Sequence, residues 1–207
     1  MGFKTRKDRP EYLGKFLNGY SALVKAVLID AQFATAWSPE SDNERAFEQA
    51  NTGKHKLSLG GGSGLCAIVG GCGIAHVWRK GGVLTFADHY DDGDEDIPIG
   101  IGTALFDIPT QRPTKLGTLR VTSGVVAFVD TSHPVTGLGS AVLRRLSGHG
   151  GAKRVGGALV VGIPNGEYEL WIEEFGEEGV EGDWGLIEKR FRIVPVGTLV
   201  TSGAAVA

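Results

Sequence analysis

The stretch Gly117–Asp130, GTLRVTSGVVAFVD, decides the fold expected for this chain. Apolar side chains recur at every second position on both sides of a Ser123-Gly124 break, and the alternate positions are more mixed. This period of two is typical of a half-buried β-strand, and a Ser-Gly break fits a kink or bulge. We therefore expect two extended arms that meet at Ser123-Gly124, with one face buried.

Short apolar runs separated by glycine also fill residues 56–108, with a spacing of roughly eight to twelve residues that is typical of β-sandwiches and barrels. The chain has 33 glycines in 207 residues, about twice the usual share of roughly 7%, which indicates many tight turns and bulges. No long helical pattern lies between the runs. The sequence therefore predicts a mainly β protein, an antiparallel β-sandwich or barrel.

One or two short helices are expected near the N-terminus. Arg9–Ala22 has apolar residues at three- and four-residue steps, and we interpret it as an amphipathic helix. Residues 22–29 predict a strand that 31–37 could continue. Ser38-Pro39-Glu40 is a good helix start, because Ser caps and Pro suits the first turn; this helix should end near Asn51-Thr52-Gly53.

The last third of the chain predicts a long antiparallel hairpin. Ala158–Ile163 is a buried strand, and Pro164-Asn165-Gly166 is a turn. Glu167–Glu174 and Leu186–Val194 both alternate, and they flank an acidic loop that should form the hairpin tip. Ser140–Leu146 is expected to form one or two helical turns. The predicted core comprises Leu119, Val121, Val125, Val129, Leu159, Val161, Tyr168, Leu170 and Ile172.

The length fits one β-rich domain over residues 1–207, and Gln111-Arg112-Pro113 is a linker candidate that would divide it into 1–110 and 114–207. The net charge of −3 gives no global attraction to nucleic acid or to an anionic membrane. Neither a membrane-spanning apolar run nor a signal peptide is recognisable, and Cys66 and Cys72 are too few for a disulfide framework. We expect a cytoplasmic protein without a cofactor. Its oligomeric state is not encoded in any pattern.

The acidic loop 88–96 is the densest set of possible ligands for a hard cation such as calcium or magnesium. Its spacing fails the EF-hand pattern, because Tyr90 stands where a ligand belongs and Ile99 where the terminal Glu belongs. We interpret it as a solvated acidic loop or as a negative patch that steers a basic partner, and we expect no tightly bound metal. The weak metal candidates are Asp88, Asp91, Asp92, Asp94 and Asp96.

Other chemistry-bearing patterns are incomplete. The Cys66, Cys72 and His76 group lacks the paired spacing and fourth ligand of a zinc site. Residues 60–64 lack the Gly-Lys-Ser/Thr ending of a phosphate loop and are interpreted as a turn between strands. The basic, glycine-rich segment Arg144–Arg154 could fold around an anion or form an exposed loop. No catalytic residue is assigned.

The anchor GTLRVTSGVVAFVD, followed by IPNGEYELWI at Ile163–Ile172, resembles uncharacterised bacterial β-rich domains found among the immunity proteins of polymorphic toxin systems. The resemblance covers the chain from Gly117 onward. It implies a protein that blocks a toxin's active site with its surface, and so it carries over no catalytic residues.

The function expected from these observations is non-enzymatic protein binding, most concretely an immunity-type inhibitor of a bacterial toxin. The partner would have a basic surface, since the hairpin tip combines exposed carboxylates with aromatic anchors. The candidate contact residues are Glu174, Phe175, Glu177, Glu178, Glu181, Asp183 and Trp184. The alternatives are a small-ligand or carbohydrate-binding sandwich that uses Trp171 and Trp184, a metal-dependent hydrolase built on the 88–96 loop, and a structural module of a larger assembly.

Overall fold

A computed structural model describes residues 9–17, 25–68, 74–90, 101–176, 179–182, 185–198 and 200 of the chain. Its strands are β1 (Glu11–Leu17), β2 (Lys25–Asp30), β3 (Lys56–Leu59), β4 (Gly62–Ile68), β5 (Ile74–Lys80), β6 (Val83–Tyr90), β7 (Thr114–Val121), β8 (Val125–Val129), β9 (Ala152–Val155), β10 (Ala158–Gly162), β11 (Gly166–Glu174), β12 (Val180–Gly182) and β13 (Gly185–Pro195). Its helices are the 3-10 helix η2 (Ala31–Ala36) and the α-helices α1 (Pro39–Asn51), α2 (Ile101–Asp107) and α3 (Ser140–His149).

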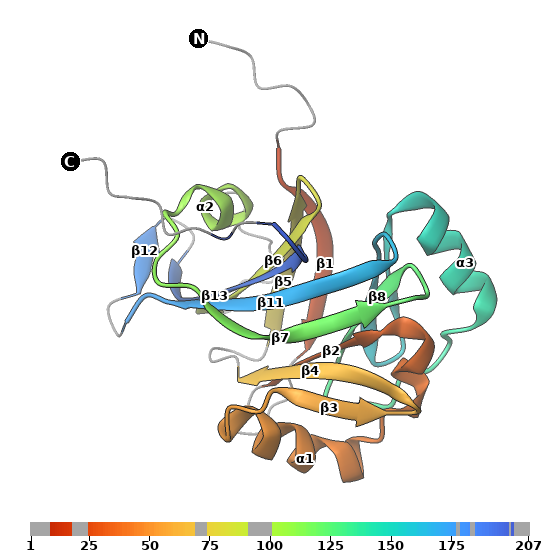
Figure 1. Cartoon of the computed structure of the whole chain (residues 1–207). Coiled ribbons are helices and arrows are strands. Elements are labelled where there is room, and N and C mark those ends of the chain that lie inside the picture. Colours follow the sequence, from red (N-terminus) through yellow and green to blue (C-terminus); the bar gives the residue numbers. More distant parts are fainter. Residues whose placement is uncertain are drawn as a thin grey trace.

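The strands form two antiparallel sheets that pack face to face (Figure 1). The seven-stranded sheet has the order β1-β5-β6-β13-β11-β7, and β12 pairs with β13 beside this path. The six-stranded sheet has the order β3-β4-β2-β8-β10-β9. Each sheet takes strands from both sides of residues 111–113. The prediction of a mainly β, antiparallel sandwich is confirmed, and the two sheets do not close into a barrel.

The seven-stranded sheet meets the six-stranded sheet along both of its edges. Edge strand β7 lies against β4 and β2, and the opposite edge strand β1 lies against β8, β9 and β10. The apolar interior is therefore enclosed along its sides and is reached from the strand ends.

The Ser123-Gly124 break is a corner at which the chain leaves one sheet and enters the other, from β7 to β8. A second crossing, from β10 to β11, passes the same corner, and the Ile163 amide donates to the Gly124 carbonyl over 2.9 Å. Gly124 has a φ of 72°, and a Cβ there would lie 2.6 Å from Cβ of Ser147. Only glycine fits this corner without strain.

Asp30, at the end of β2, fastens the corner. Its carboxylate is buried and accepts hydrogen bonds from the amides of Thr122 (2.6 Å) and Ser123 (3.2 Å) and from the Thr122 hydroxyl (2.8 Å). Burial alone raises the pKa of Asp30, but these hydrogen bonds outweigh it and hold the pKa below its ordinary value.

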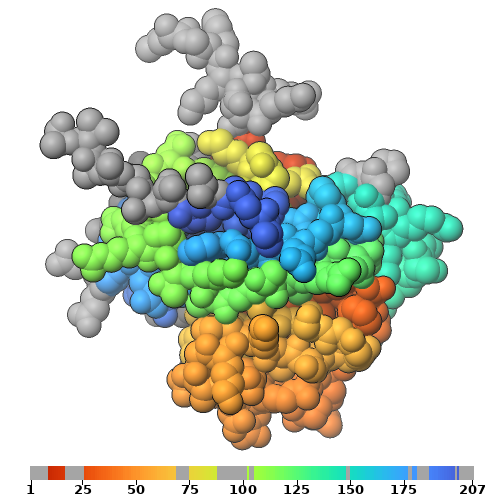
Figure 2. Space-filling view, viewed as in Figure 1, coloured from red at the N-terminus to blue at the C-terminus, as the bar shows by residue number. Residues whose placement is uncertain are grey.

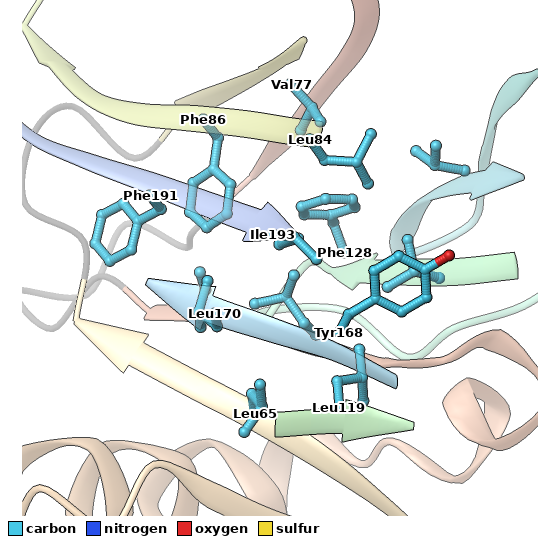
Figure 3. Packing of buried hydrophobic residues seen from close by; sticks show 14 of the residues in the cluster. Leu65, Val77, Leu84, Phe86, Leu119, Phe128, Tyr168, Leu170, Phe191 and Ile193 are labelled. Atoms are coloured by element: carbon cyan, nitrogen blue, oxygen red, sulfur yellow. The ribbon is translucent and has the colours of Figure 1, made fainter. Parts of the chain in front are cut away.

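The main core lies between the sheets (Figure 3). Phe86 stacks on Phe191 with ring centroids 4.8 Å apart, and it meets Phe128 of the opposite sheet edge-on at 5.7 Å. Tyr168 is buried with its hydroxyl donating to the Pro164 carbonyl over 2.6 Å. Every predicted core residue is buried except Ile172, which is half-buried and packs against the core.

A second core lies on the other face of the six-stranded sheet, beneath η2, α1 and α3. Strand β8 is consequently buried on both faces: Val126 and Phe128 enter the main core, whereas Val125, Ala127 and Val129 face the helices. The single buried face expected to run through Ser123-Gly124 is therefore wrong. The crossing places β8 in a sheet that helices cover, and both of its faces are apolar for that reason.

Helix α1 begins and ends as predicted. Ser38 occupies the N-cap position and Pro39 begins the helix, but the Ser38 side chain makes no capping hydrogen bond; instead the buried Asp42 carboxylate accepts from the Ser38 amide over 2.8 Å. The helix expected at Arg9–Ala22 is wrong, because Glu11–Leu17 is strand β1, paired with β5. The pairing of β1 with β5 shifts register between Tyr12 and Gly14, and Gly14 has a φ of 138°. This irregularity gives the apolar residues of the strand a three- and four-residue spacing that resembles that of a helix.

Three other elements differ from expectation in length or type. Residues 31–36 form η2 instead of continuing β2, and the apolar run at 104–108, interpreted as strand-like, belongs largely to α2. Helix α3 extends to His149, beyond the expected one or two turns. The long hairpin is confirmed: β11 pairs with β13 from Tyr168–Pro195 to Glu174–Lys189, and β12 extends it at the tip.

Candidate functional site

A cleft of about 670 Å³ opens where β4 ends and β7 begins, at the opposite end of β7 from the Ser123-Gly124 corner. We call it the end cleft. It also takes residues from the C-terminal end of α1, the end of β11 and the facing part of β13. Its lining comprises Ala50, His55, Ala67, Ile68, Arg112, Thr114, Leu116, Ile172, Glu174, Gly176 and Lys189.

The floor of the end cleft is apolar. Ala67 belongs to the main core, and Leu116 and Ile172 are partly buried against it, while Ile68 packs against the helix-covered core. The cleft is thus the place where the interior between the sheets comes to the surface. A ligand seated there would remove apolar area from water, which is worth about 25 cal/mol per Å².

The rim of the end cleft is charged. Arg112 and Glu174 are exposed, and Lys189 and His55 are half-buried. Lys189 stands opposite Glu174 in the β11–β13 register. Within the part of the chain that the structure describes, neither Arg112 nor Lys189 forms an ion pair. Two cations without an ion pair among the described residues therefore stand with one exposed carboxylate above an apolar floor.

Two rim residues have a left-handed backbone. His55 has a φ of 52° and Arg112 a φ of 37°, and these are the non-glycine residues with positive φ in the described ranges. Such conformations cost of order 1 kcal/mol each and cluster at binding and catalytic sites. Both of these residues line the same cleft, which marks it as the part of the surface where backbone strain is concentrated.

The contacts of β4 hold His55 in place. His55 Nδ1 lies 3.0 Å from the Cys66 carbonyl oxygen, and the Cys66 amide donates to the His55 carbonyl over 2.9 Å. The Cys66 thiol is buried, and burial raises its pKa to about 11. At neutral pH this thiol is protonated, so Cys66 acts as a small apolar residue beneath the cleft.

The predicted hairpin-tip residues fall partly within the described structure. Glu174 lies on the cleft rim, whereas Phe175 is half-buried with its ring 5.3 Å from the Arg190 guanidinium carbon. Glu181 lies in β12, and its side chain is not described. Glu177, Glu178, Asp183 and Trp184 lie outside the described residues. The structure adds His55, Arg112 and Lys189 to Glu174, and none of these was singled out as a binding residue from the sequence.

A buried charge cluster lies next to the tip. Glu173, which the alternation of β11 places on the face opposite Tyr168 and Leu170, is buried with Arg190, and their side chains form an ion pair. Glu173 Oε1 also lies 3.3 Å from Arg192 Nε. Arg190 donates to the carbonyls of Leu105 (2.9 Å) and Ile108 (2.8 Å), which fixes the segment after α2 on the outer face of the sheet. These charges are occupied in holding the fold together.

The other sequence candidates are separated or fall outside the description. Cys66 lies in the six-stranded sheet, whereas His76 lies in the seven-stranded sheet with its Nδ1 3.1 Å from the Tyr12 hydroxyl; Cys72 is not described. The turn expected at residues 60–64 is confirmed for Gly60-Gly61, whereas residues 62–64 already belong to β4. Asp88 is in β6 with an undescribed side chain, and 91–96 lie outside the described residues. Among the residues that are described, no three His, Cys, Asp or Glu side chains are grouped to hold a metal ion.

Trp171, the described residue of the carbohydrate-binding alternative, is half-buried beside Glu169. Its indole N–H donates to Glu169 Oε2 over 3.1 Å, and Glu169 also pairs with Lys115 at 2.5 Å. The hydrogen bond from Lys115 is the main reason why the pKa of Glu169 lies below its ordinary value. The indole and the carboxylate therefore bind each other.

No helix in the described ranges has both the length and the apolar character needed to cross a membrane. In comparisons with known proteins, no family model, no curated protein and no solved structure matches this chain.

Proposed function

We propose that this protein is a non-enzymatic protein-binding module, and that the end cleft and the adjoining hairpin tip form its contact surface. Its most concrete form is an immunity-type inhibitor of a bacterial toxin. One observation carries the proposal: Arg112 and Lys189, which form no ion pair among the described residues, stand with Glu174 at the rim of an apolar floor.

The two parts of this surface have different roles. The apolar floor supplies binding energy when a partner side chain displaces water from Leu116 and Ile172. The rim charges orient the partner, because an unmatched charge brought into a dry contact costs several kcal/mol. Arg112 and Lys189 would receive a carboxylate of the partner, and the glutamates of the tip would face the basic part of the partner's surface.

The carbohydrate-binding alternative has weaker support. The volume of the end cleft is within the range of small-ligand sites, roughly 300–1,000 Å³. However, Trp171 and Glu169 satisfy each other outside the cleft lining, and among the described residues no Phe, Tyr or Trp lines the cleft as a platform for a sugar.

The proposal is tested by comparing three tagged variants with the wild type in capture from the source cell, followed by titration with the purified partner. Arg112→Glu and Lys189→Glu reverse rim charges, and Arg120→Glu is the matched control, because Arg120 is exposed on β7 outside the cleft lining. We expect the two rim variants to bind about tenfold more weakly and the control to bind normally. Thermal melting checks that each variant is folded.

Equal binding of one partner by the wild type and all variants would contradict the proposal. Specific binding of a sugar, lost in Trp171→Ala and kept in Arg112→Glu, would replace it with the carbohydrate alternative.

A further inference from the structure

A second charged surface lies on α3 and β9. Residues 131–166 contain no Asp or Glu, but they contain Arg144, Arg145, Lys153 and Arg154. Helix α3 carries the first two, and β9 carries the other two. All four are exposed. A protein with a net charge of −3 therefore has a locally cationic face.

A groove of about 630 Å³ lies between α3 and β9, within this face. We call it the α3 groove. Most of its lining is small or apolar, and two cations flank it. The lining comprises Ala141, Val142, Arg145, Leu146, Gly151, Ala152 and Lys153.

Two of the four cations on this face, Arg144 and Lys153, have no ion pair among the described residues. The nearby Asp130 carboxylate is buried, accepts from the Ser132 amide over 3.1 Å and lies 3.1 Å from His133 Nδ1. Its contact with Arg154 is long, at 4.0 Å.

The character of the lining distinguishes between anionic ligands. Single-stranded nucleic acid is usually held by aromatic side chains on which the bases stack, and none of the described residues that line this groove is aromatic. A floor of alanine, valine and leucine suits aliphatic side chains, and cations on both sides suit carboxylates. An acidic polypeptide with apolar residues between its carboxylates offers both.

We propose that the α3 groove binds an acidic polypeptide segment of this kind. Lys153 and Arg145 receive its carboxylates, and Val142, Leu146 and Ala152 receive its apolar side chains. This site is separate from the end cleft, with which it shares no lining residue. Figure 1 places α3 and β12 on opposite sides of the molecule, and in Figure 2 the blue-green surface of α3 projects from one side.

The test is fluorescence anisotropy with the full chain and a labelled peptide made of the repeat Glu-Glu-Leu. Three comparison probes are the same peptide with Ser for Leu, a peptide of the repeat Lys-Lys-Leu, and a single-stranded oligodeoxynucleotide of equal charge. We expect the Glu-Glu-Leu peptide to bind best and binding to weaken as salt rises. Lys153→Glu should weaken it by about tenfold, because the change removes an attraction and adds a repulsion.

Two variants serve as controls. Lys56→Glu makes the same charge change on an exposed residue of β3, and Arg112→Glu makes it at the end cleft. Both should bind the Glu-Glu-Leu peptide within about twofold of the wild type. Peptide binding at the α3 groove does not depend on whether Arg112→Glu weakens partner binding at the end cleft. Each of the two proposals can therefore fail without the other.

Three results would overturn the inference. If Lys153→Glu and Lys56→Glu weakened binding of the Glu-Glu-Leu peptide equally, the peptide would be responding only to the net charge of the protein. Tighter binding of the oligodeoxynucleotide, lost in Lys153→Glu, would make the face a nucleic-acid surface. Salt-sensitive self-association in sedimentation, abolished by Lys153→Glu and without peptide binding, would identify a second copy as the occupant.

Discussion

Removing the Glu173 carboxylate should strongly destabilise this protein. Arg190 is fully buried, and its guanidinium is compensated by Glu173 and by the carbonyls of Leu105, Ile108 and Pro109. Arg192, on the same strand, lies 3.3 Å from the same carboxylate. Burial already lowers the pKa of Arg190 and of Arg192, because a low dielectric disfavours their charge. In Glu173→Ala, both cations lose their only described counter-ion.

Breaking a buried pair from one side costs about 3–5 kcal/mol, which corresponds to a fall in Tm of roughly 10 °C for a chain of this size. Urea unfolding followed by tryptophan fluorescence measures the loss. Glu167→Ala is the matched control, because Glu167 is exposed on the same strand, and it should change stability by less than about 0.5 kcal/mol. Hydrogen exchange at residues 105–109 should rise in Glu173→Ala alone.

A double variant separates lost charge compensation from lost packing. Glu173→Leu combined with Arg190→Met replaces the pair with apolar side chains and should be more stable than Glu173→Leu alone. The reasoning is refuted if Glu173→Ala lowers the free energy of unfolding by no more than Glu167→Ala does. It is also refuted if the double variant is no more stable than Glu173→Leu alone.

Four further outcomes are expected. Val121→Ala should lower the free energy of unfolding by about 2–4 kcal/mol in urea titrations, because it leaves a cavity in the main core. Asp30→Asn should lower the Tm at neutral pH. Since the pKa of Asp30 is lowered in the folded state, the wild type loses this stabilisation as Asp30 becomes protonated, and the Tm difference between wild type and variant should shrink as the pH falls below about 4. Gly124→Ala should cost more in thermal melts than Gly53→Ala, since both have a φ of 72° but a Cβ would meet a neighbour within 4 Å only at Gly124. Micromolar calcium should leave Tm unchanged, since residues 88–96 lack a recognisable ligand frame; a rise reversed by chelator would contradict this.

Local alternation and turn residues were enough to predict much of the fold. The β11–β13 hairpin follows from its period of two, and α1 follows from Ser38-Pro39. Gly14 marks where this reasoning fails: it permits a bulge in β1, and the shifted register makes the apolar spacing similar to that of a helix. The sequence also could not show that β7 and β8 belong to different sheets, because Ser-Gly is compatible both with a corner between two sheets and with a bulge within one strand.

The candidate site was less accessible from the sequence. Glu174 was identified because carboxylates crowd the hairpin tip, but His55, Arg112 and Lys189 come from three separate segments that meet only in the folded chain. The alternation of β11 gives the face on which Glu173 lies but not what covers that face, which is the segment 105–109, distant in sequence. Such pairings depend on topology, which short-range patterns do not contain.

The central place of β13 in the seven-stranded sheet has a consequence for biosynthesis. The strand lies between β6 and β11, so the β1-β5-β6 group and the β7-β11 pair share no hydrogen-bonded neighbour without it. Among the described strands it comes last in sequence, ending at Pro195, and so it is synthesised after all of its sheet neighbours. Until the ribosome has produced β13, the other strands of that sheet form two separate groups whose apolar faces are exposed. Closure of the sandwich therefore waits until β13 has been synthesised, and a chain truncated before β13 would be a substrate for chaperones and proteases.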